Sequence, residues 1–165
     1  MVSSRAFSLV EVVIAVGVVA VAIVAILGLL PSLNRQAAES ADQLTAQHLA
    51  DGLAVELQII VDRDGLGALA TSAPVMRAPL EGGLAFVAPR SGVPLRPSAG
   101  AASTEEDYFL VEVWRFNSGP LAHTPGSAVL PLYARVSWPH RLKGVAVPVA
   151  SSDRTQVGFA LAVNP

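Results

Sequence analysis

A single carboxylate, Glu11, lies at the start of an apolar run that extends from Val12 to Leu30. The run contains no charged, amide or hydroxyl side chain. An ionisable group at the centre of a membrane segment costs about 2.5–3.5 kcal/mol on insertion scales, and less near the edge, so such a group usually has a partner. Because no Lys or Arg occurs between Phe7 and Leu30, a cation for Glu11 must come from another chain or from a chain terminus.

A terminus of the right charge would form if the bond between Ala6 and Phe7 were cut. The new amine of Phe7 would lie four residues before Glu11 in the sequence. A neighbouring copy that is shifted along the helix axis would be better placed to contact this amine than the same copy. This hypothesis makes Glu11 an assembly residue.

The apolar run has the length of a membrane span. At about 1.5 Å per residue, a helix from Val12 to Leu30 is roughly 28 Å long, close to the hydrocarbon thickness of a bilayer. Two other interpretations remain open on the residues alone. In a plain single-pass anchor, Arg5 holds the N-terminus in the cytoplasm and Glu11 lies among the headgroups. In a secretory signal peptide, cleavage would come well after residue 20, although the run exceeds the usual ~7–15 apolar residues.

The segment Phe7–Ala15, FSLVEVVIA, strongly resembles the N-terminal motif of type IV pilins and pseudopilins. In that family a short charged leader precedes a Phe, and Glu is the fifth mature residue before a long apolar helix. The resemblance implies a leader of residues 1–6, cleavage between Ala6 and Phe7 by a prepilin peptidase, and N-methylation of Phe7. It also implies that Glu11 pairs with the Phe7 amine of an adjacent subunit during filament assembly.

The same resemblance implies a location and partners. The chain is expected in the bacterial inner (cytoplasmic) membrane as a single-pass protein with a cytoplasmic N-terminus and its head outside, and then in a pilus or pseudopilus. The implied partners are the prepilin peptidase and methyltransferase, other pilin or pseudopilin subunits, and membrane lipid.

Three departures from the family pattern refine this expectation. Ala6 stands where the family usually has Gly, and Ala is the closest substitute in size. The proline common near the middle of major pilin helices is absent, since Pro31 comes later, and the chain contains no cysteine. The last two departures favour a minor pilin or pseudopilin over a main pilus subunit.

Other residues that could do chemistry form no recognisable site. The histidines, His48, His123 and His140, are scattered without metal-ligand spacing. Asp62–Gly67 lacks two ligands of an EF-hand loop and is predicted to be a helix-terminating turn. Glu105–Asp107 is predicted to be a solvated turn, although some pseudopilins bind calcium in their heads. No phosphate-binding loop, nucleophile elbow or dinucleotide fingerprint is present, so neither enzymatic activity nor a cofactor is expected.

Composition excludes further classes of function. The net charge is −2, and Lys143 is the only lysine in 165 residues, so no nucleic-acid partner is predicted. The absence of cysteine excludes a disulfide framework and thiolate metal sites.

The elements that position Glu11 follow from the residue patterns. An α+β protein is predicted, with a membrane-spanning helix over residues 7–30, an amphipathic continuation over 31–64 and a β-rich head over 65–165. Pro31 either ends the apolar run or kinks the helix. The continuation has an apolar face at Leu49, Leu53, Leu57 and Ile60 and a wet face at Arg35, Glu39, Asp42, Asp51 and Glu56.

In the head, a change to a period of two residues predicts a small antiparallel sheet. The predicted strands are Leu84–Ala88, Asp107–Phe116, Leu132–Trp138 and Val157–Val163, while Val145–Val149 is either an edge strand or a loop. Residues 65–104 are otherwise predicted to be connecting loops, and Trp114 and Trp138 to be core residues.

Three hypotheses remain after these observations, and the third, after the two below, is a secreted enzyme with a signal peptide. The leading hypothesis is a minor pilin or pseudopilin-like subunit of a type IV pilus-like or type II secretion filament. The alternative is a single-pass, membrane-anchored binding module that does not polymerise.

Overall fold

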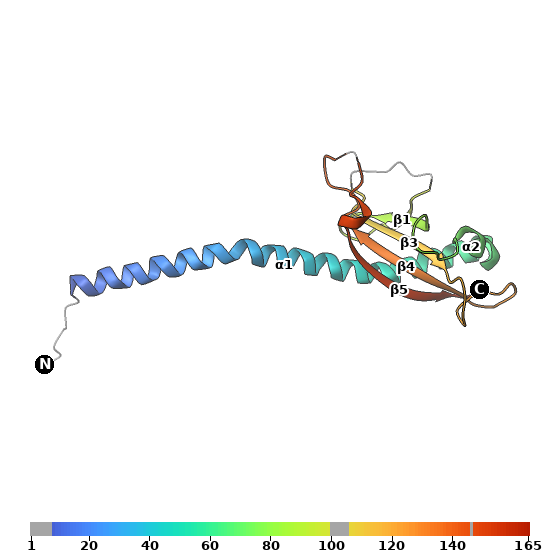
Figure 1. Cartoon of the computed structure of the whole chain (residues 1–165), viewed down its shortest axis with the longest axis horizontal. Helices are drawn as coiled ribbons and strands as arrows, with labels where there is room; N and C mark the ends of the chain where they lie inside the picture. Colours follow the sequence, from blue (N-terminus) through green and yellow to red (C-terminus); the bar gives the residue numbers. More distant parts are fainter. Residues whose placement is uncertain (1–7, 100–105, 146) are drawn as a thin grey trace. The chain divides into compact units, whose positions relative to one another are not determined.

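The computed structural model describes residues 8–99, 106–145 and 147–165. It confirms an α+β fold with a long N-terminal helix and an antiparallel sheet (Figure 1). The elements are α1 (Leu9–Asp64), α2 (Leu66–Ser72), β1 (Leu84–Ala88), β2 (Arg96–Pro97), β3 (Phe109–Arg115), β4 (Leu130–Trp138), the 3-10 turn η1 (Ser151–Asp153) and β5 (Thr155–Val163). The chain divides into two compact units between Ala41 and Asp42, so that α1 contributes to both.

The described part of the first unit is the beginning of α1. Every side chain from Ser8 to Ala41 is exposed. The helix continues through Pro31, where the apolar run ends. A proline removes one backbone hydrogen bond, and a long helix tolerates that loss when neighbouring groups compensate. Beside it, the Ser32 hydroxyl donates to the carbonyl of Leu29 at 2.8 Å.

In the second unit, the rest of α1 packs one face against the sheet. Its buried residues recur every three or four positions, as a helix with one apolar face requires, and they are Asp42, Ala46, Leu49, Leu53, Leu57 and Val61. Ile60 packs at the edge of the same core. The predicted apolar face is therefore confirmed.

Helix α1 ends at Asp64, as predicted, because Gly65 adopts a φ of +85° that side-chain-bearing residues rarely adopt. The next residues differ from the prediction. A second short helix, α2, replaces the expected loop and buries Leu69 and Ala70. Gly67, the second residue of this seven-residue segment, favoured the loop prediction.

The sheet has the strand order β2-β1-β3-β4-β5, and every neighbouring pair is antiparallel. Strand β1 has the predicted bounds, and β3, β4 and β5 correspond to the other predicted strands to within two residues. Strand β2 was not predicted, since two residues are too short for a periodic signal. Among the residues described between Val145 and Val149 there is no strand, so this segment is a loop.

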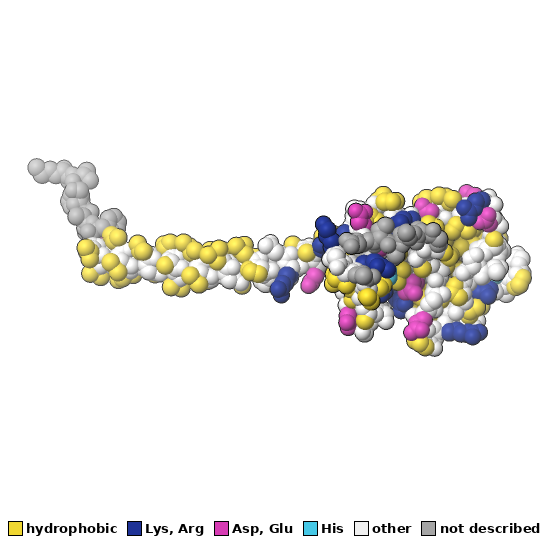
Figure 2. Space-filling model, turned by 90° about the horizontal axis from the view of Figure 1, so that it is seen from above, with side chains coloured by type: hydrophobic (Ala, Val, Ile, Leu, Met, Phe, Trp, Pro, Cys, Tyr) yellow, Lys and Arg dark blue, Asp and Glu magenta, His cyan; other side chains and the backbone are white. Residues whose placement is uncertain are grey.

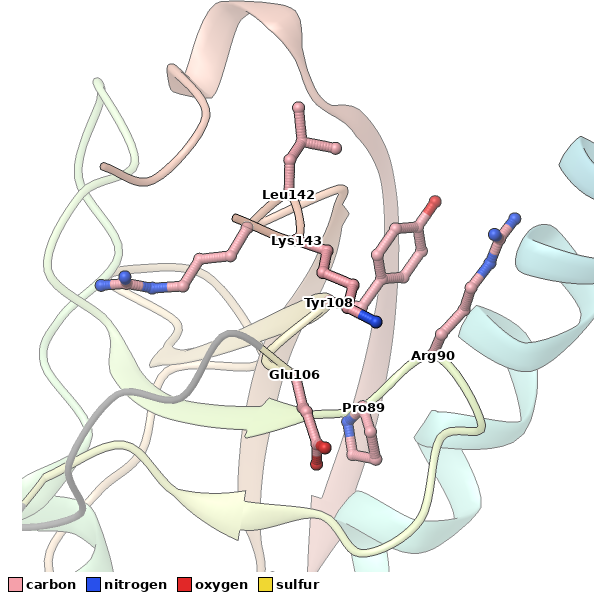
Figure 3. Close-up of a pocket in the computed structure, with 7 residues that line it drawn as sticks. Pro89, Arg90, Glu106, Tyr108, Leu142 and Lys143 are labelled. Atoms are coloured by element: carbon pink, nitrogen blue, oxygen red, sulfur yellow. The ribbon is translucent and has the colours of Figure 1, made fainter. Parts of the chain in front are cut away.

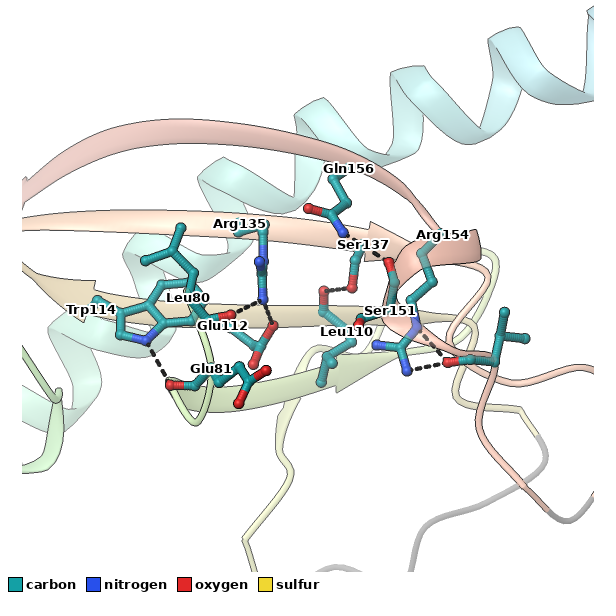
Figure 4. A network of polar contacts seen from close by, with 11 residues as sticks. Leu80, Glu81, Leu110, Glu112, Trp114, Arg135, Ser137, Ser151, Arg154 and Gln156 are labelled. Atoms are coloured by element: carbon teal, nitrogen blue, oxygen red, sulfur yellow. Dashed lines mark hydrogen bonds and ion pairs between the residues drawn. The ribbon is translucent and has the colours of Figure 1, made fainter. Parts of the chain in front are cut away.

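The two faces of the sheet differ. The face toward α1 carries the main core, which includes Phe86, Phe109, Val111, Leu132, Val136 and Trp138. Trp114 is also buried, as predicted, but it alternates with these residues and lies on the opposite face. There the guanidinium of Arg135 lies 5.0 Å from the Trp114 ring centroid and donates to Glu112 at 2.6 Å (Figure 4). A second layer of polar and aromatic contacts thus covers the outer face.

Candidate membrane and assembly segment

Glu11 lies in the first turn of α1, next to Ser8. Its backbone N–H donates to the Ser8 carbonyl at 3.1 Å and to the Ser8 hydroxyl oxygen at 3.3 Å. A serine that accepts a bond from the third residue after it is the usual N-terminal cap of a helix. A carboxylate in the first turn is also favoured by the helix dipole.

The residues at this helix start follow a local pattern that the sequence analysis missed. The pattern Ser-x-x-Glu from Ser8 to Glu11 is the signature of a capping box, and it was readable from the sequence. A carboxylate at position 11 therefore has a local structural reason, the first turn of the helix, that needs no partner on another chain. Any test of Glu11 must separate these two roles.

The helix surface that follows Glu11 is apolar on all sides. Side chains from Val12 to Leu30 are exposed, and none in the most apolar window is buried. Figure 2 shows hydrophobic side chains covering this stretch of the helix. Helix α1 is the one described helix that is long and apolar enough to cross a membrane. A surface that is apolar on every side requires lipid or other protein around it.

Two glycines interrupt this surface. A Cβ atom added at Gly17 or Gly28 would meet nothing within 4 Å. Nothing inside the described chain therefore requires glycine at either position. Small residues on apolar helices allow the backbone of another helix to approach closely, which agrees with a role in packing against other molecules.

The remaining predicted site residues, Ala6 and Phe7, lie outside the described residues. Glu11 is the predicted site residue that the structure describes.

The other candidate residues are not brought together. His48 lies on the exposed surface of α1, while His123 and His140 lie in the loops after β3 and β4. The described residues contain no group of three or more His, Cys, Asp or Glu that could hold a metal ion. Burial, with smaller contributions from the charges of Arg154 and Arg141, lowers the pKa of His140 to about 4. His140 is therefore a neutral, partly buried residue at neutral pH.

The acidic residues Asp107 and Asp42 are in different environments from those predicted. Asp107 was expected in a solvated turn, but it is buried and forms an ion pair with Arg96. Glu106 is exposed, as predicted, and Glu105 lies outside the described residues. Because a buried carboxylate needs a partner, the ion pair with Arg96 explains how Asp107 is tolerated in the head.

Asp42 was expected on the wet face of α1, and this prediction is wrong. It is buried, and both of its carboxylate oxygens accept bonds from Arg90, at 2.8 and 2.9 Å. The hydroxyl of Tyr108 donates to the same carboxylate at 2.7 Å. Burial, and then the bond to Asp42, raise the pKa of Tyr108 to about 12. These contacts fix the first helical turn of the head unit to the loop after β1 and to the start of β3.

A cavity of about 840 Å³ lies beside this cluster (Figure 3). Its lining includes Arg90, Tyr108, Glu106, Leu142 and Lys143. Arg90 and Tyr108 already bond to Asp42, so these two side chains serve the attachment of α1. The cavity was not predicted, because its lining comes from segments that are far apart in the sequence.

Comparison with known proteins provides no relative from which the function of this segment can be taken. No family model, no curated protein and no solved structure matches this chain.

Proposed function

We propose that this chain is a minor pilin or pseudopilin-like subunit of a type IV pilus-like or type II secretion filament. The apolar part of α1 holds it in the bacterial inner membrane, with the N-terminus in the cytoplasm and the head outside. A prepilin peptidase cleaves between Ala6 and Phe7, and Phe7 is N-methylated. Glu11 then pairs with the Phe7 amine of a neighbouring subunit as the filament grows.

One observation carries the proposal. A single carboxylate, Glu11, within the motif FSLVEVVIA precedes an uncharged helical surface that is exposed on every side. Such a surface suits two environments, the lipid of the membrane before assembly and the bundle of other helices after it. A buried charge pair between subunits would set their axial register, which is the best-attested use of buried polar groups.

The alternative is a membrane-anchored module that does not polymerise, and the Ser8 cap favours it. If the role of Glu11 is confined to the first turn of the helix, the residue needs no charged partner. Three variants separate the hypotheses. Glu11→Gln removes the charge but keeps a residue suited to a capping box, Glu11→Ala removes the charge and the side chain that a capping box uses, and Ser8→Ala removes the observed cap and leaves Glu11 in place.

Filament incorporation is measured by shearing cells or purifying the secretion apparatus and quantifying this chain. If the charge pair is essential, Glu11→Gln and Glu11→Ala both lose about tenfold or more of the incorporated chain, equivalent to about 1.4 kcal/mol. Ser8→Ala retains most of it. Incorporation of Glu11→Gln at the wild-type level would contradict the charge pair.

The processing step has its own test. Intact mass and N-terminal sequencing of the native protein should find a chain that begins at N-methylated Phe7. An uncleaved chain would support the membrane-anchored module. A chain that begins near residue 23 or later would indicate a secreted protein and overturn the proposal.

A further inference from the structure

Arg115 is the last residue of β3 and lies on the face of the sheet that carries the core. Along this strand Phe109, Val111 and Val113 are buried in the core, and successive side chains of a strand alternate between its two faces. Arg115 comes two residues after Val113, so its side chain continues the buried row. A guanidinium therefore lies where the pattern would place another apolar side chain.

The backbone of Arg115 is held by the segment that follows α2. Its N–H donates to the carbonyl of Pro74 at 2.9 Å, and its carbonyl accepts from the N–H of Met76 at 2.8 Å. On the other side it pairs with Leu132 of β4. The position from which the side chain extends is thus fixed on both sides.

The side chain of Arg115 differs from those of other half-buried arginines in the head. Three of these bond to acceptors within the chain, and the pairs are Arg96 with Asp107, Arg135 with Glu112, and Arg154 with the carbonyl of Val149. Arg115 is also half-buried, but its Nε atom is buried without a hydrogen-bond partner among the described residues. Its guanidinium forms no ion pair with a described carboxylate. A cation that is partly removed from water requires an acceptor, because the loss of hydration is costly.

Arg115 lines a cavity of about 660 Å³. The other walls come from α2, from the loop between β3 and β4, and from Pro165. Figure 1 shows α2 and the C-terminus at the same end of the sheet. The volume falls within the range of roughly 300–1,000 Å³ that is typical of small-molecule sites.

His123, in the loop between β3 and β4, contributes a second polar atom without a partner to the same cavity. Its Nδ1 is buried, and no group in the described part of the chain bonds to it. An arginine whose stem covers the end of the core while its charge reaches water would account for Arg115 alone. It would not account for the buried Nε atom or for His123. Two orphaned polar atoms from separate segments indicate a ligand that contacts both.

The charge of this lining is of one sign. The residues described around the cavity include Arg115 and His123 but no aspartate or glutamate. Two other cavities of the head, beside Tyr108 and beside Arg154, each include a glutamate. The remaining walls are mostly apolar, and they include Leu66, Ala70, Pro125, Ala128 and Pro165. A mainly apolar cavity with one cation suits an anion that has an apolar body.

We propose that this cavity binds a small organic monocarboxylate. The carboxylate would accept hydrogen bonds from Arg115 and His123, and the apolar body would lie against Leu66, Ala70 and Pro125. The planar fork of a guanidinium matches the two oxygens of a carboxylate.

The supply of donors favours a carboxylate over a phosphate. One arginine offsets one negative charge, whereas a phosphate carries up to two and has more oxygens to satisfy. The two hydroxyls of the lining already donate to backbone carbonyls, Thr71 to Gly67 at 2.9 Å and Ser127 to Val129 at 3.0 Å. They therefore add little to the donors available for a second charge.

The test is equilibrium dialysis of the full chain in detergent against radiolabelled hexanoate, benzoate or phenylacetate, with detergent alone subtracted. At least one should bind saturably with a Kd on the order of 1 mM, as expected for ligands of this size. Its neutral amide should compete at least about tenfold more weakly. Absence of saturable binding up to about 10 mM would overturn the proposal. Equal competition by the amide, or stronger competition by inorganic phosphate, would also overturn it.

A matched pair of variants assigns the binding to Arg115. Arg115→Gln removes the cation of the cavity, and Arg77→Gln removes the same charge from an exposed position outside it. The first should weaken binding by about tenfold or more, and the second should leave it unchanged. Loss of one hydrogen bond in His123→Ala should weaken binding by about threefold or more. Wild-type binding by Arg115→Gln or by His123→Ala would contradict the site.

A third variant guards against a general loss of folding. Ala128 is exposed and lines the cavity, so Ala128→Phe narrows it while Arg115 stays in place. Binding should be lost although the thermal melt stays like that of the wild type. Unchanged binding in this variant would overturn the assignment to this cavity.

This inference is independent of filament assembly, because the cavity belongs entirely to the head unit and Glu11 does not. Glu11→Gln should therefore bind the carboxylate like the wild type. Weaker binding in Glu11→Gln would contradict that independence.

Discussion

The two parts of α1 share one secondary structure but lie in different environments. From Leu9 to Ala41 every side chain is exposed, although most are apolar up to Leu30. From Asp42 to Asp64 one residue in every three or four is buried against the sheet. The same backbone conformation is therefore supported by packing within the chain in the second part only.

This difference shows where the stability of each part originates. Intrinsic helix propensity contributes little, and most helical stability in proteins comes from packing of an apolar face. The second part has that packing in the head. The first part has none within the described chain, so its apolar surface must be covered from outside the chain. Four predictions test this contrast.

The largest effect is expected from one leucine in each part. Leu53 is fully buried and Leu27 is 58% exposed. Leu53→Ala should lower the free energy of unfolding of the head by about 2–5 kcal/mol, because it removes buried groups and leaves a cavity. Leu27→Ala should leave that free energy unchanged. Guanidinium titration of the full chain in detergent, followed by the fluorescence of the buried tryptophans, measures both. Equal losses would contradict the contrast.

A lysine introduced into each part of α1 tests whether the apolar run is the membrane anchor. Val21→Lys places a cation near the centre of the apolar run, at a cost of about 2.5–3.5 kcal/mol for insertion. Val55→Lys places the same cation on an exposed position of the second part. The first variant should lose most of its alkali-resistant membrane fraction, and the second should keep it. Retention of Val21→Lys in the membrane would show that this segment is not the anchor.

A substitution of Arg90 tests whether the contacts of Asp42 stabilise the head unit. Arg90→Gln leaves the buried carboxylate of Asp42 with one described partner, the Tyr108 hydroxyl. The expected loss of unfolding free energy is about 1–3 kcal/mol, the penalty for an incompletely satisfied buried group. Arg77→Gln, at an exposed position, is the control and should change it by less than about 0.5 kcal/mol. If both variants unfold alike, the cluster does not stabilise the head.

The smallest effect is a pH dependence confined to the head. The pKa of His140 is lowered from 6.5 to about 4, so the folded head favours the neutral ring. The resulting stability is complete above the unfolded pKa of 6.5 and is lost as pH falls toward 4. His140→Gln should make the free energy of unfolding depend less on pH over this range. His48→Gln, on the exposed surface of α1, should leave the slope as in the wild type.

Much of the fold could be predicted because its signals are local. Alternating residues predicted β4 and β5, since a half-buried strand imposes a period of two, and aromatic and β-branched residues predicted β3. Helical spacing from Leu49 to Leu57 predicted the face that packs on the sheet. The short elements α2 and β2 were missed because seven and two residues carry too few periods to recognise.

The environments of individual charges could not be predicted in the same way. Asp42 lies in a segment with several acidic residues, and its partners in the buried site, Arg90 and Tyr108, are 48 and 66 positions away. Asp107 depends in the same way on Arg96. The cap at Ser8 was missed for a different reason: its signal is local, but the sequence analysis did not use it.

The sequence was sufficient to establish an apolar helix with a carboxylate at its start and a β-rich head, because composition and periodicity act over a few neighbouring residues. The burial of Asp42 and Asp107, the position of Trp114 on the outer face and the exposed edge at β5 depend on the tertiary structure. Whether a charge is buried or a strand edge is exposed depends on which distant segments of the chain contact each other. Those contacts form only when the whole head packs around one core.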